Sequence, residues 1–228
     1  MKKNKLIIIL VSLVLVITVV FIGLFVSTKY EAKEIINRSH VFLKKTSDKY
    51  YLDPLIKDEN KDTVGWIKVE GTEIDYPVVQ YSDNEYYLNH DFYNDRNSNG
   101  WVFLDSKSKL DDQNLIVYGQ FNLDGSIFGT IDEVFKVSKE KKNDVKKIIF
   151  ITDKDYFEYN IFSAYIVNEN DKYNNRKYDN LSETLKLFKE RSEIPFNDSL
   201  DGVDHIITLS TINEKDNDRM VIHGYKKK

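Results

Sequence analysis

The sequence contains no cysteine among its 228 residues. Disulfide bonds, zinc–thiolate centres and thiol nucleophiles are therefore excluded. Proline and glycine are scarce, at three and nine residues, and the chain shows no internal repeat or low-complexity segment. Basic residues do not outnumber acidic ones, and a net charge of −4 gives no positive field of the kind that binds nucleic acid. The sequence therefore predicts no nucleic-acid partner, no metal and no cofactor.

Aromatic residues are abundant, with 15 tyrosines and 13 phenylalanines. Together with the low glycine and proline content, they are typical of a β-rich domain. The length is sufficient for one domain with its own hydrophobic core and an additional anchor segment.

An apolar segment of leucine, isoleucine, valine and phenylalanine spans residues 6–26. A helix of roughly 20 residues crosses a bilayer core. The alternative is a cleaved signal peptide, but its apolar region is usually about 7–15 residues long, and no convincing small-x-small site follows Val26. We expect a single-pass anchor, with residues 1–5 as a cytoplasmic tail because Lys2, Lys3 and Lys5 precede the segment. The rest of the chain then lies outside the cell membrane.

Residues 27–61 are polar with a helical pattern, which predicts a stalk and N-terminal helices packed on the main domain. Pro54 interrupts a second helical stretch. One apolar face is formed by Ile35, Ile36, His40, Val41 and Leu43.

From Val64 onward, apolar residues alternate with a period of two, which is typical of strands. Residues 126–134 and 181–191 are predicted to be short helices. Many short strands with few helices favour a barrel or a sandwich, in a domain over residues 62–228. The predicted strands lie at residues 64–71, 72–80, 100–104, 114–118, 147–152, 156–167, 206–212 and 219–223.

The stretch from Ile206 to Gly224 reads IITLSTINEKDNDRMVIHG: a strand, a polar loop and a second strand. It resembles the signature of sortases, membrane-anchored cysteine transpeptidases of Gram-positive cell surfaces, in which Thr-Leu-x-Thr-Cys precedes a loop and an arginine. Thr208, Leu209, Thr211 and Arg219 match that pattern, whereas Ile212 stands at the cysteine position.

Further segments resemble class B sortases in order and spacing, including IDYPVVQ, SDNEYYLNHDF, VYGQFNLDGSIFG and YNIFSAYIV. The resemblance implies a mostly β fold: an eight-stranded sortase β-barrel with N-terminal helices and a few peripheral helices, preceded by one transmembrane helix.

The resemblance also implies a chemistry of three residues. A cysteine thiolate attacks the sorting-signal peptide, a histidine transfers protons, and an arginine stabilises the oxyanion. Here Gln120 occupies the histidine position in the Tyr-Gly-His-Asn-type turn, and an amide does not titrate. Ile212 has no nucleophilic atom, so Arg219 alone is retained. Designed inactivation usually substitutes alanine or serine, so isoleucine with glutamine favours a natural loss.

A replacement nucleophile is the alternative. Thr211 is adjacent to Ile212, but strand alternation places it on the opposite face. Ser210 shares the face of Ile212 and has no evident base. His90 and His223 lie in stretches that are ordinary for the family, and we interpret both as structural or surface residues.

The resemblance implies that Asn84, Leu88, Ser210 and Arg219 line a peptide groove, with residues 178–200 as one wall. Simpler roles compete: Leu88 as core, Asn84 as a helix cap, and Arg219 as the partner of Asp216 or Asp218. A calcium loop is a weak alternative for residues 95–100, which read as a polar turn because Ser106 stands where glutamate is needed.

Three functions are compatible with these residues. The first is an inactive sortase-like protein at the cell surface that binds a sorting-signal-like peptide, a surface protein or an active sortase. The second is a sortase B-type transpeptidase or peptidase that attaches surface proteins to the cell wall through unorthodox residues. The third is a structural relic.

Overall fold

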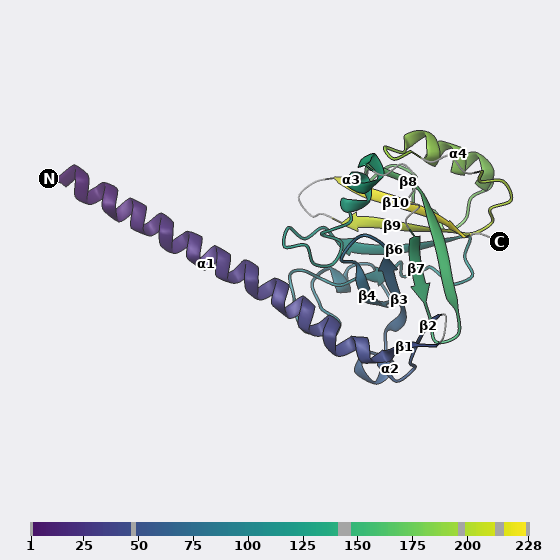
Figure 1. Ribbon diagram of the computed structural model, residues 1–228, viewed down its shortest axis with the longest axis horizontal. Helices are drawn as coiled ribbons and strands as arrows, with labels where there is room; N and C mark the ends of the chain where they lie inside the picture. The colour runs from purple at the N-terminus through teal and green to yellow at the C-terminus, as the bar shows by residue number, and fades with distance from the viewer. Residues whose placement is uncertain (1, 47–48, 141–146, 196–198, 213–216, 227–228) are drawn as a thin grey trace.

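The computed structural model describes residues 2–46, 49–140, 147–195, 199–212 and 217–226. Its main body is a closed barrel of eight strands in the order β10-β8-β7-β3-β4-β5-β6-β9 (Figure 1). The predicted eight-stranded barrel is therefore confirmed. The barrel strands are β3 (Thr63–Val69), β4 (Asp75–Val79), β5 (Phe103–Leu104), β6 (Asn114–Gln120), β7 (Lys147–Ile151), β8 (Tyr156–Asn168), β9 (Ile206–Ile212) and β10 (Asp218–Lys226).

Helices and a small hairpin surround the barrel. The helices are α1 (Lys2–Ser39), α2 (Ile56–Glu59), α3 (Glu133–Glu140) and α4 (Leu181–Arg191), with 3-10 turns η1 (His40–Phe42) and η2 (Tyr86–Leu88). The hairpin consists of β1 (Leu43–Lys45) and β2 (Tyr50–Leu52). Helix α4 has the predicted bounds; the Asn180 side chain accepts a hydrogen bond from the Glu183 amide and caps its first turn.

The wall formed by β6, β9 and the middle of β10 is buried on both of its faces. One face contributes Ile207, Leu209 and Ile222 to the main core, and we call it the inner face. The other, which we call the outer face, contributes Ile206 and Val221 to a second apolar cluster. That cluster includes Leu181, Leu185 and Phe188 of α4, so α4 covers the outer face. Burial on both sides explains why every residue of β9 except Ile212 is buried, the polar Thr208 and Ser210 included.

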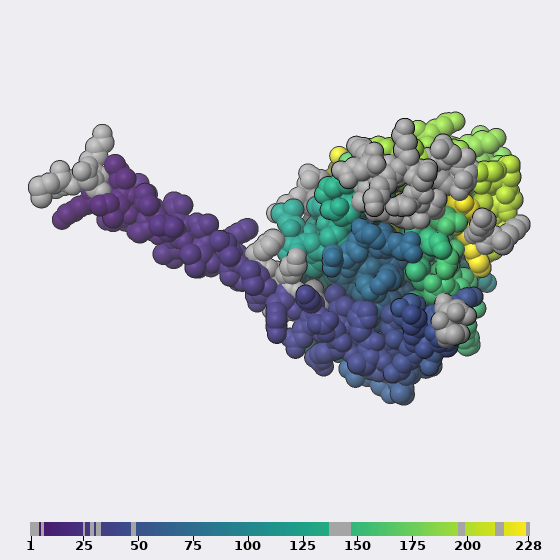
Figure 2. All heavy atoms as spheres, in the orientation of Figure 1, coloured from purple at the N-terminus to yellow at the C-terminus, as the bar shows by residue number. Residues whose placement is uncertain are grey.

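Helix α1 leaves the barrel as a single rod, which Figures 1 and 2 show extending away from the globular part. Its segment Ile7–Leu24 has a mean hydropathy of 3.3, with none of it buried. Its last turns dock on the barrel, where Ile35 and Ser39 are buried and the Arg38 guanidinium lies 4.5 Å from the ring centre of Tyr93. The candidate anchor and the docked end therefore belong to one continuous helix.

Two local predictions were correct only in part. Within residues 27–61, α1 ends at Ser39, the η1 turn and the β1–β2 hairpin follow, and α2 is the second helical stretch, directly after Pro54. The predicted helix at residues 126–134 begins only at Glu133. Its first half is turns, because the Tyr76 hydroxyl accepts the amide hydrogen of Ile127 and an added Cβ at Gly129 would lie 2.1 Å from the Asn122 carbonyl oxygen. Tertiary contacts override helix propensity there.

Candidate functional site

The three residues that the sequence resemblance places at catalytic positions lie in one row at one end of the barrel. Strands β6 and β9 are parallel neighbours, and Gln120 and Ile212 are Cα partners at their ends. Strand β10 pairs antiparallel to β9, with Val221 opposite Ser210. Two residues before Val221 is Arg219, and two residues after Ser210 is Ile212. In an antiparallel pair these two residues lie opposite each other, so Arg219 and Ile212 share the outer face at the same end of the barrel. The fold thus brings together the three positions that the sequence singles out.

Gln120 is only partly buried, and its side chain is engaged by the chain itself. Its Nε2 donates a hydrogen bond to the main-chain oxygen of Leu88, the residue that ends η2. Leu88 is partly buried and packs against the main core. An amide in this position fixes the segment carrying Leu88, and it offers no titrating proton.

Ile212 is a partly buried apolar side chain in the middle of the row. Ser210 is the preceding residue of β9 that faces the same side as Ile212. It is buried, and its Oγ lies 3.0 Å from the Tyr173 hydroxyl. Burial raises the pKa of Tyr173, so its phenol is a poor base for activating Ser210 at neutral pH. Thr211 lies on the opposite face, as expected, and its Oγ1 accepts the Met220 amide hydrogen at 2.9 Å.

Arg219 forms an ion pair that the sequence does not reveal. Its Nη2 lies 2.6 Å from Oε2 of Glu169, which follows β8, and the Arg219 side chain is only 12% exposed. The alternative partner Asp218 makes no ion pair in the described part of the chain, and Asp216 lies outside the described residues. Arg219 is thus held on the site face by a carboxylate from the neighbouring strand.

Two buried tyrosines complete the polar rim of the row. Tyr118 lies beside Ser210 on the outer face, and its hydroxyl accepts a hydrogen bond from Asn174 Nδ2 at 2.8 Å. Burial raises the pKa of Tyr118 far above its ordinary value, and the nearby Arg219 opposes that shift. Both phenols therefore remain neutral hydrogen-bonding groups near the guanidinium.

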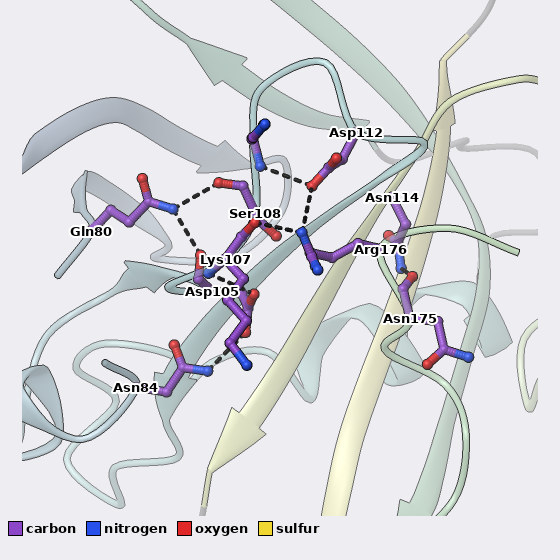
Figure 3. A network of polar contacts seen from close by, with 10 residues as sticks. Gln80, Asn84, Asp105, Lys107, Ser108, Asp112, Asn114, Asn175 and Arg176 are labelled. Atoms are coloured by element: carbon purple, nitrogen blue, oxygen red, sulfur yellow. Dashed lines mark hydrogen bonds and ion pairs between the residues drawn. The ribbon is translucent and has the colours of Figure 1, made fainter. Parts of the chain in front are cut away.

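Asn84 uses both ends of its amide within the protein. Its Nδ2 donates to Asp105 Oδ2 at 2.7 Å (Figure 3). Its Oδ1 accepts the Ser106 amide hydrogen at 2.7 Å. The helix-cap alternative is wrong, because Asp83 Oδ1 accepts the amide hydrogens at the start of η2. Asn84 therefore holds the turn after β5, and its contact with a peptide stays a prediction.

The segment leading to α4 is tied to the same turn. Arg176 Nη1 donates to the Lys107 carbonyl oxygen at 2.7 Å, with Asp112 at 3.9 Å (Figure 3). Asn114 of β6 donates to the Asn175 carbonyl oxygen at 2.9 Å. Within residues 178–200, the described part packs on the outer face through α4. Its role as one wall of a peptide groove stays a prediction.

His90 and His223 are both engaged in ring stacking and hydrogen bonds within the fold. His223 is fully buried on the outer face, with its ring stacked 3.9 Å from that of Phe188. Its nitrogens bond to Thr208 and Tyr165, and burial lowers its pKa to about 3, with Arg191 adding to the shift. His90 stacks on Tyr86 at 4.0 Å. Both are structural, which agrees with the interpretation from the sequence.

The polar turn at residues 95–100 is held by hydrogen bonds from its backbone amides to nearby side-chain oxygens. Asn97 Oδ1 accepts the Asn99 amide hydrogen, and Asp91 Oδ1 accepts that of Asp95. Within the described part of the chain, no group of three acidic, histidine or cysteine residues is placed to hold a metal ion.

Comparison with known proteins assigns the family. No family model matches the chain. It is 34% identical over 177 residues to a sortase B from Listeria monocytogenes, covering 72% of this chain and 70% of the relative. The chain belongs to the sortase B family. A sortase B from Staphylococcus aureus is 33% identical over 160 residues, covering 68% of this chain and 65% of that one.

Solved sortase B structures share the barrel. A sortase B from B. anthracis superimposes with a TM-score of 0.75 at 23% identity, covering 89% of this chain and 99% of that one, which bears on the fold alone. A Staphylococcus aureus sortase B–substrate complex gives 0.70 at 25% identity, covering 88% and 93%. A sortase B complexed with triglycine gives 0.68 at 28%, covering 76% and 84%.

Several residues of the site escape sequence reasoning. Glu169, Tyr173 and Asn174 lie about 40 residues before Ile212 in the sequence, and no motif marks them. They reach the row only because β8 and β10 are neighbours and the connection to α4 crosses the outer face. The one signal is polar residues directly after a long buried strand, where loops commonly contribute to function.

Proposed function

We propose that this chain is a membrane-anchored, catalytically inactive member of the sortase B family. It binds a sorting-signal-like peptide, or the surface protein that carries one, at the extracytoplasmic face of a Gram-positive cell. The observation that carries the proposal is the row of Gln120, Ile212 and Arg219 on a complete barrel.

The loss of chemistry follows from residue types. A chain without cysteine has no thiolate, and Ile212 supplies no substitute. Ser210 is buried against a neutral tyrosine, and His223 is sealed beneath α4 with a pKa of about 3. In another hydrolase, loss of the nucleophile alone costs about 10⁶ in rate.

The ligand class rests on two features. Sortase B relatives have been captured with a substrate and with triglycine, which supports a peptide ligand for this chain as well. In this chain Arg219, Leu88 and the tyrosine hydroxyls surround one barrel end. Their hydrogen-bonding groups and partly apolar surface suit an extended peptide backbone.

The position at the membrane rests on α1. Its segment Ile7–Leu24 is an apolar stretch of 18 residues, and the helix continues to its docked end at Ser39. An anchored barrel holds its ligand near the cell surface, where an active sortase also works. Such a protein modulates surface-protein attachment by holding substrates.

The test uses the full chain in detergent micelles with a fluorescent sorting-signal peptide. We expect saturable binding by fluorescence anisotropy and an intact peptide by mass spectrometry after prolonged incubation with triglycine. The Arg219→Gln variant should bind more weakly, whereas Arg96→Gln, an exposed arginine of the 91–97 turn, should bind as the wild type does. Absence of binding removes the proposal, and a cleaved or triglycine-joined product supports the enzyme alternative.

A further inference from the structure

The contact between Arg219 and Glu169 is built into the register of the sheet. Arg219 is the Cα partner of Val167, and Glu169 lies two residues further along the neighbouring strand direction. Alternation places the Val167 and Glu169 side chains on the same face as Arg219, which makes Glu169 its diagonal neighbour. The Glu169 amide donates to the Asn217 carbonyl oxygen at 2.7 Å and continues the ladder. The strand register therefore places the Glu169 carboxylate next to the Arg219 guanidinium.

The two partners differ in their contact with solvent. The Arg219 side chain is 12% exposed, whereas that of Glu169 is 39% exposed. A guanidinium so far removed from water needs an anionic or hydrogen-bonding partner. A half-exposed carboxylate supplies it through a charge-assisted hydrogen bond, but such a pair contributes only a modest net stability. A ligand oxygen that binds the Arg219 guanidinium must therefore compete with the Glu169 carboxylate.

The tyrosines around Arg219 are uncharged. Burial keeps Tyr118 and Tyr173 neutral, and their hydroxyls bond to Asn174 and Ser210. The ion pair is close to neutral as a whole, and the solvent-facing end of it is the Glu169 carboxylate. A ligand carboxylate meets repulsion here, whereas an uncharged peptide carbonyl does not.

We propose that Glu169 is a specificity-determining residue. By occupying Arg219 it excludes ligands that end in a free carboxylate, and it selects the uncharged backbone of an internal peptide segment. This inference rests on the proposed function, because it defines which peptides the same site accepts. It predicts that the product-like peptide with a free acid end binds poorly to the native chain.

The first experiment compares two peptides that differ only in a C-terminal acid or amide. Isothermal titration calorimetry of the full chain in micelles should show that the native protein prefers the amide. Glu169→Gln should bind the acid about tenfold more tightly than the native chain does, because the carboxylate that competes for Arg219 and repels the ligand is then removed. The amide affinity should change less than about threefold. An unchanged acid-to-amide ratio overturns the proposal.

A matched control lies on the same strand. Glu158 of β8 pairs with Lys147 at 2.8 Å, with a side chain 45% exposed. Glu158→Gln removes an equivalent surface carboxylate far along β8 from Arg219, and it should leave the ratio as in the native chain. If it raises acid binding equally, a general loss of negative charge explains the result and the proposal is wrong.

A second arm does not depend on peptide binding. Thermal unfolding is followed in sodium sulfate and in sodium chloride of equal ionic strength, with Glu158→Gln as the reference for general salt effects. Glu169→Gln should gain additional stability in sulfate, because an anion binds the folded state only, and Glu169→Gln/Arg219→Gln should lose that gain. If no peptide binds but the sulfate gain appears, the proposed function fails while the assignment of Glu169 stands. Equal sulfate shifts in all variants overturn the assignment.

Discussion

Ile212 and Gln120 are Cα partners on adjacent strands, so the two positions that the resemblance singles out are direct neighbours. In the proposed inactive protein, a branched alkyl chain stands where the resemblance expects the attacking group. An amide that bonds to the Leu88 carbonyl oxygen stands where it expects an imidazole. Arg219 keeps its charge, but Glu169 neutralises it at 2.6 Å. Gln120 and Arg219 therefore each have a hydrogen-bonding partner within the chain, and Ile212 packs against the main core.

His223 provides a prediction at the same scale. Its pKa falls from an ordinary 6.5 to about 3 in the folded chain, through burial first and Arg191 second. The unfolded chain therefore binds a proton between these values that the folded chain does not, and the free energy of unfolding decreases as pH falls through this window. His223 alone should contribute a slope on the order of 1.4 kcal/mol per pH unit below about pH 6.

Denaturant unfolding at a series of pH values checks this slope. In His223→Asn the slope should flatten by about one proton. Should the His223 variant fail to fold, an NMR titration of the native imidazole decides. A His223 resonance that titrates near pH 6.5 contradicts the account.

At the scale of elements, Gly100 sets the position of the segment that carries Leu88. Its φ of +60° is left-handed, and a Cβ there would lie 2.6 Å from the Tyr87 and 2.8 Å from the Leu88 carbonyl oxygens. Gly100→Ala should therefore combine backbone strain with a backbone clash. We expect it to destabilise the fold by about 2–4 kcal/mol and to weaken peptide binding through Leu88.

Gly202→Ala is the matched control, because Gly202 has a φ of +72° and nothing within 4 Å of the added Cβ. It should cost only the backbone strain, about 1–2 kcal/mol. Thermal and denaturant unfolding of both variants tests the comparison. Equal losses would mean that the approach of Gly100 to η2 is not what positions Leu88.

Elements with strong local patterns are those that sequence reasoning predicted. Helix α4 has an asparagine cap and an apolar stripe, and β9 is rich in β-branched residues; both lie where the pattern places them. The three-residue strands of the β1–β2 hairpin are too short to carry a period. The turns after β6 depend on the Tyr76 hydroxyl, about 50 residues away in sequence, so no local signal predicts them.

The candidate site divides in the same way. The family resemblance leads to Gln120, Ile212 and Arg219, because they lie in recognisable motifs. Glu169 and Tyr173 become part of the site only through strand register and a crossing loop. The sequence places Asn84 in the peptide groove, whereas in the structure its amide forms hydrogen bonds with Asp105 and Ser106.

At the scale of the whole molecule, α1 joins the candidate anchor to the barrel without a break. From Val26 to its docked end at Ser39 it spans about 20 Å at 1.5 Å per residue. In the proposed anchored protein, a continuous helix of this length would hold the barrel off the bilayer as a semi-rigid spacer and would place the proposed peptide-binding end at a defined height.

Arginine substitution tests the anchor. Val14→Arg with Ile17→Arg places two charges in the apolar segment, each costing about 2.5–3.5 kcal/mol on insertion scales. We expect this variant to leave the membrane fraction on alkaline extraction, whereas Val41→Arg, at an exposed apolar position on the barrel side, should remain with it. Retention of the double variant would show that another segment binds the membrane.

The central claim is that the barrel persists while its chemistry is lost. The most direct measurement is turnover of a fluorogenic sorting peptide by the purified full chain, beside Ile212→Cys/Gln120→His. Ile166→Cys, at an exposed position on β8, controls for a thiol placed outside the row. The account predicts no turnover by the native chain or by Ile166→Cys, and cleavage by the double variant. Turnover by the native chain that disappears in Arg219→Ala would contradict it.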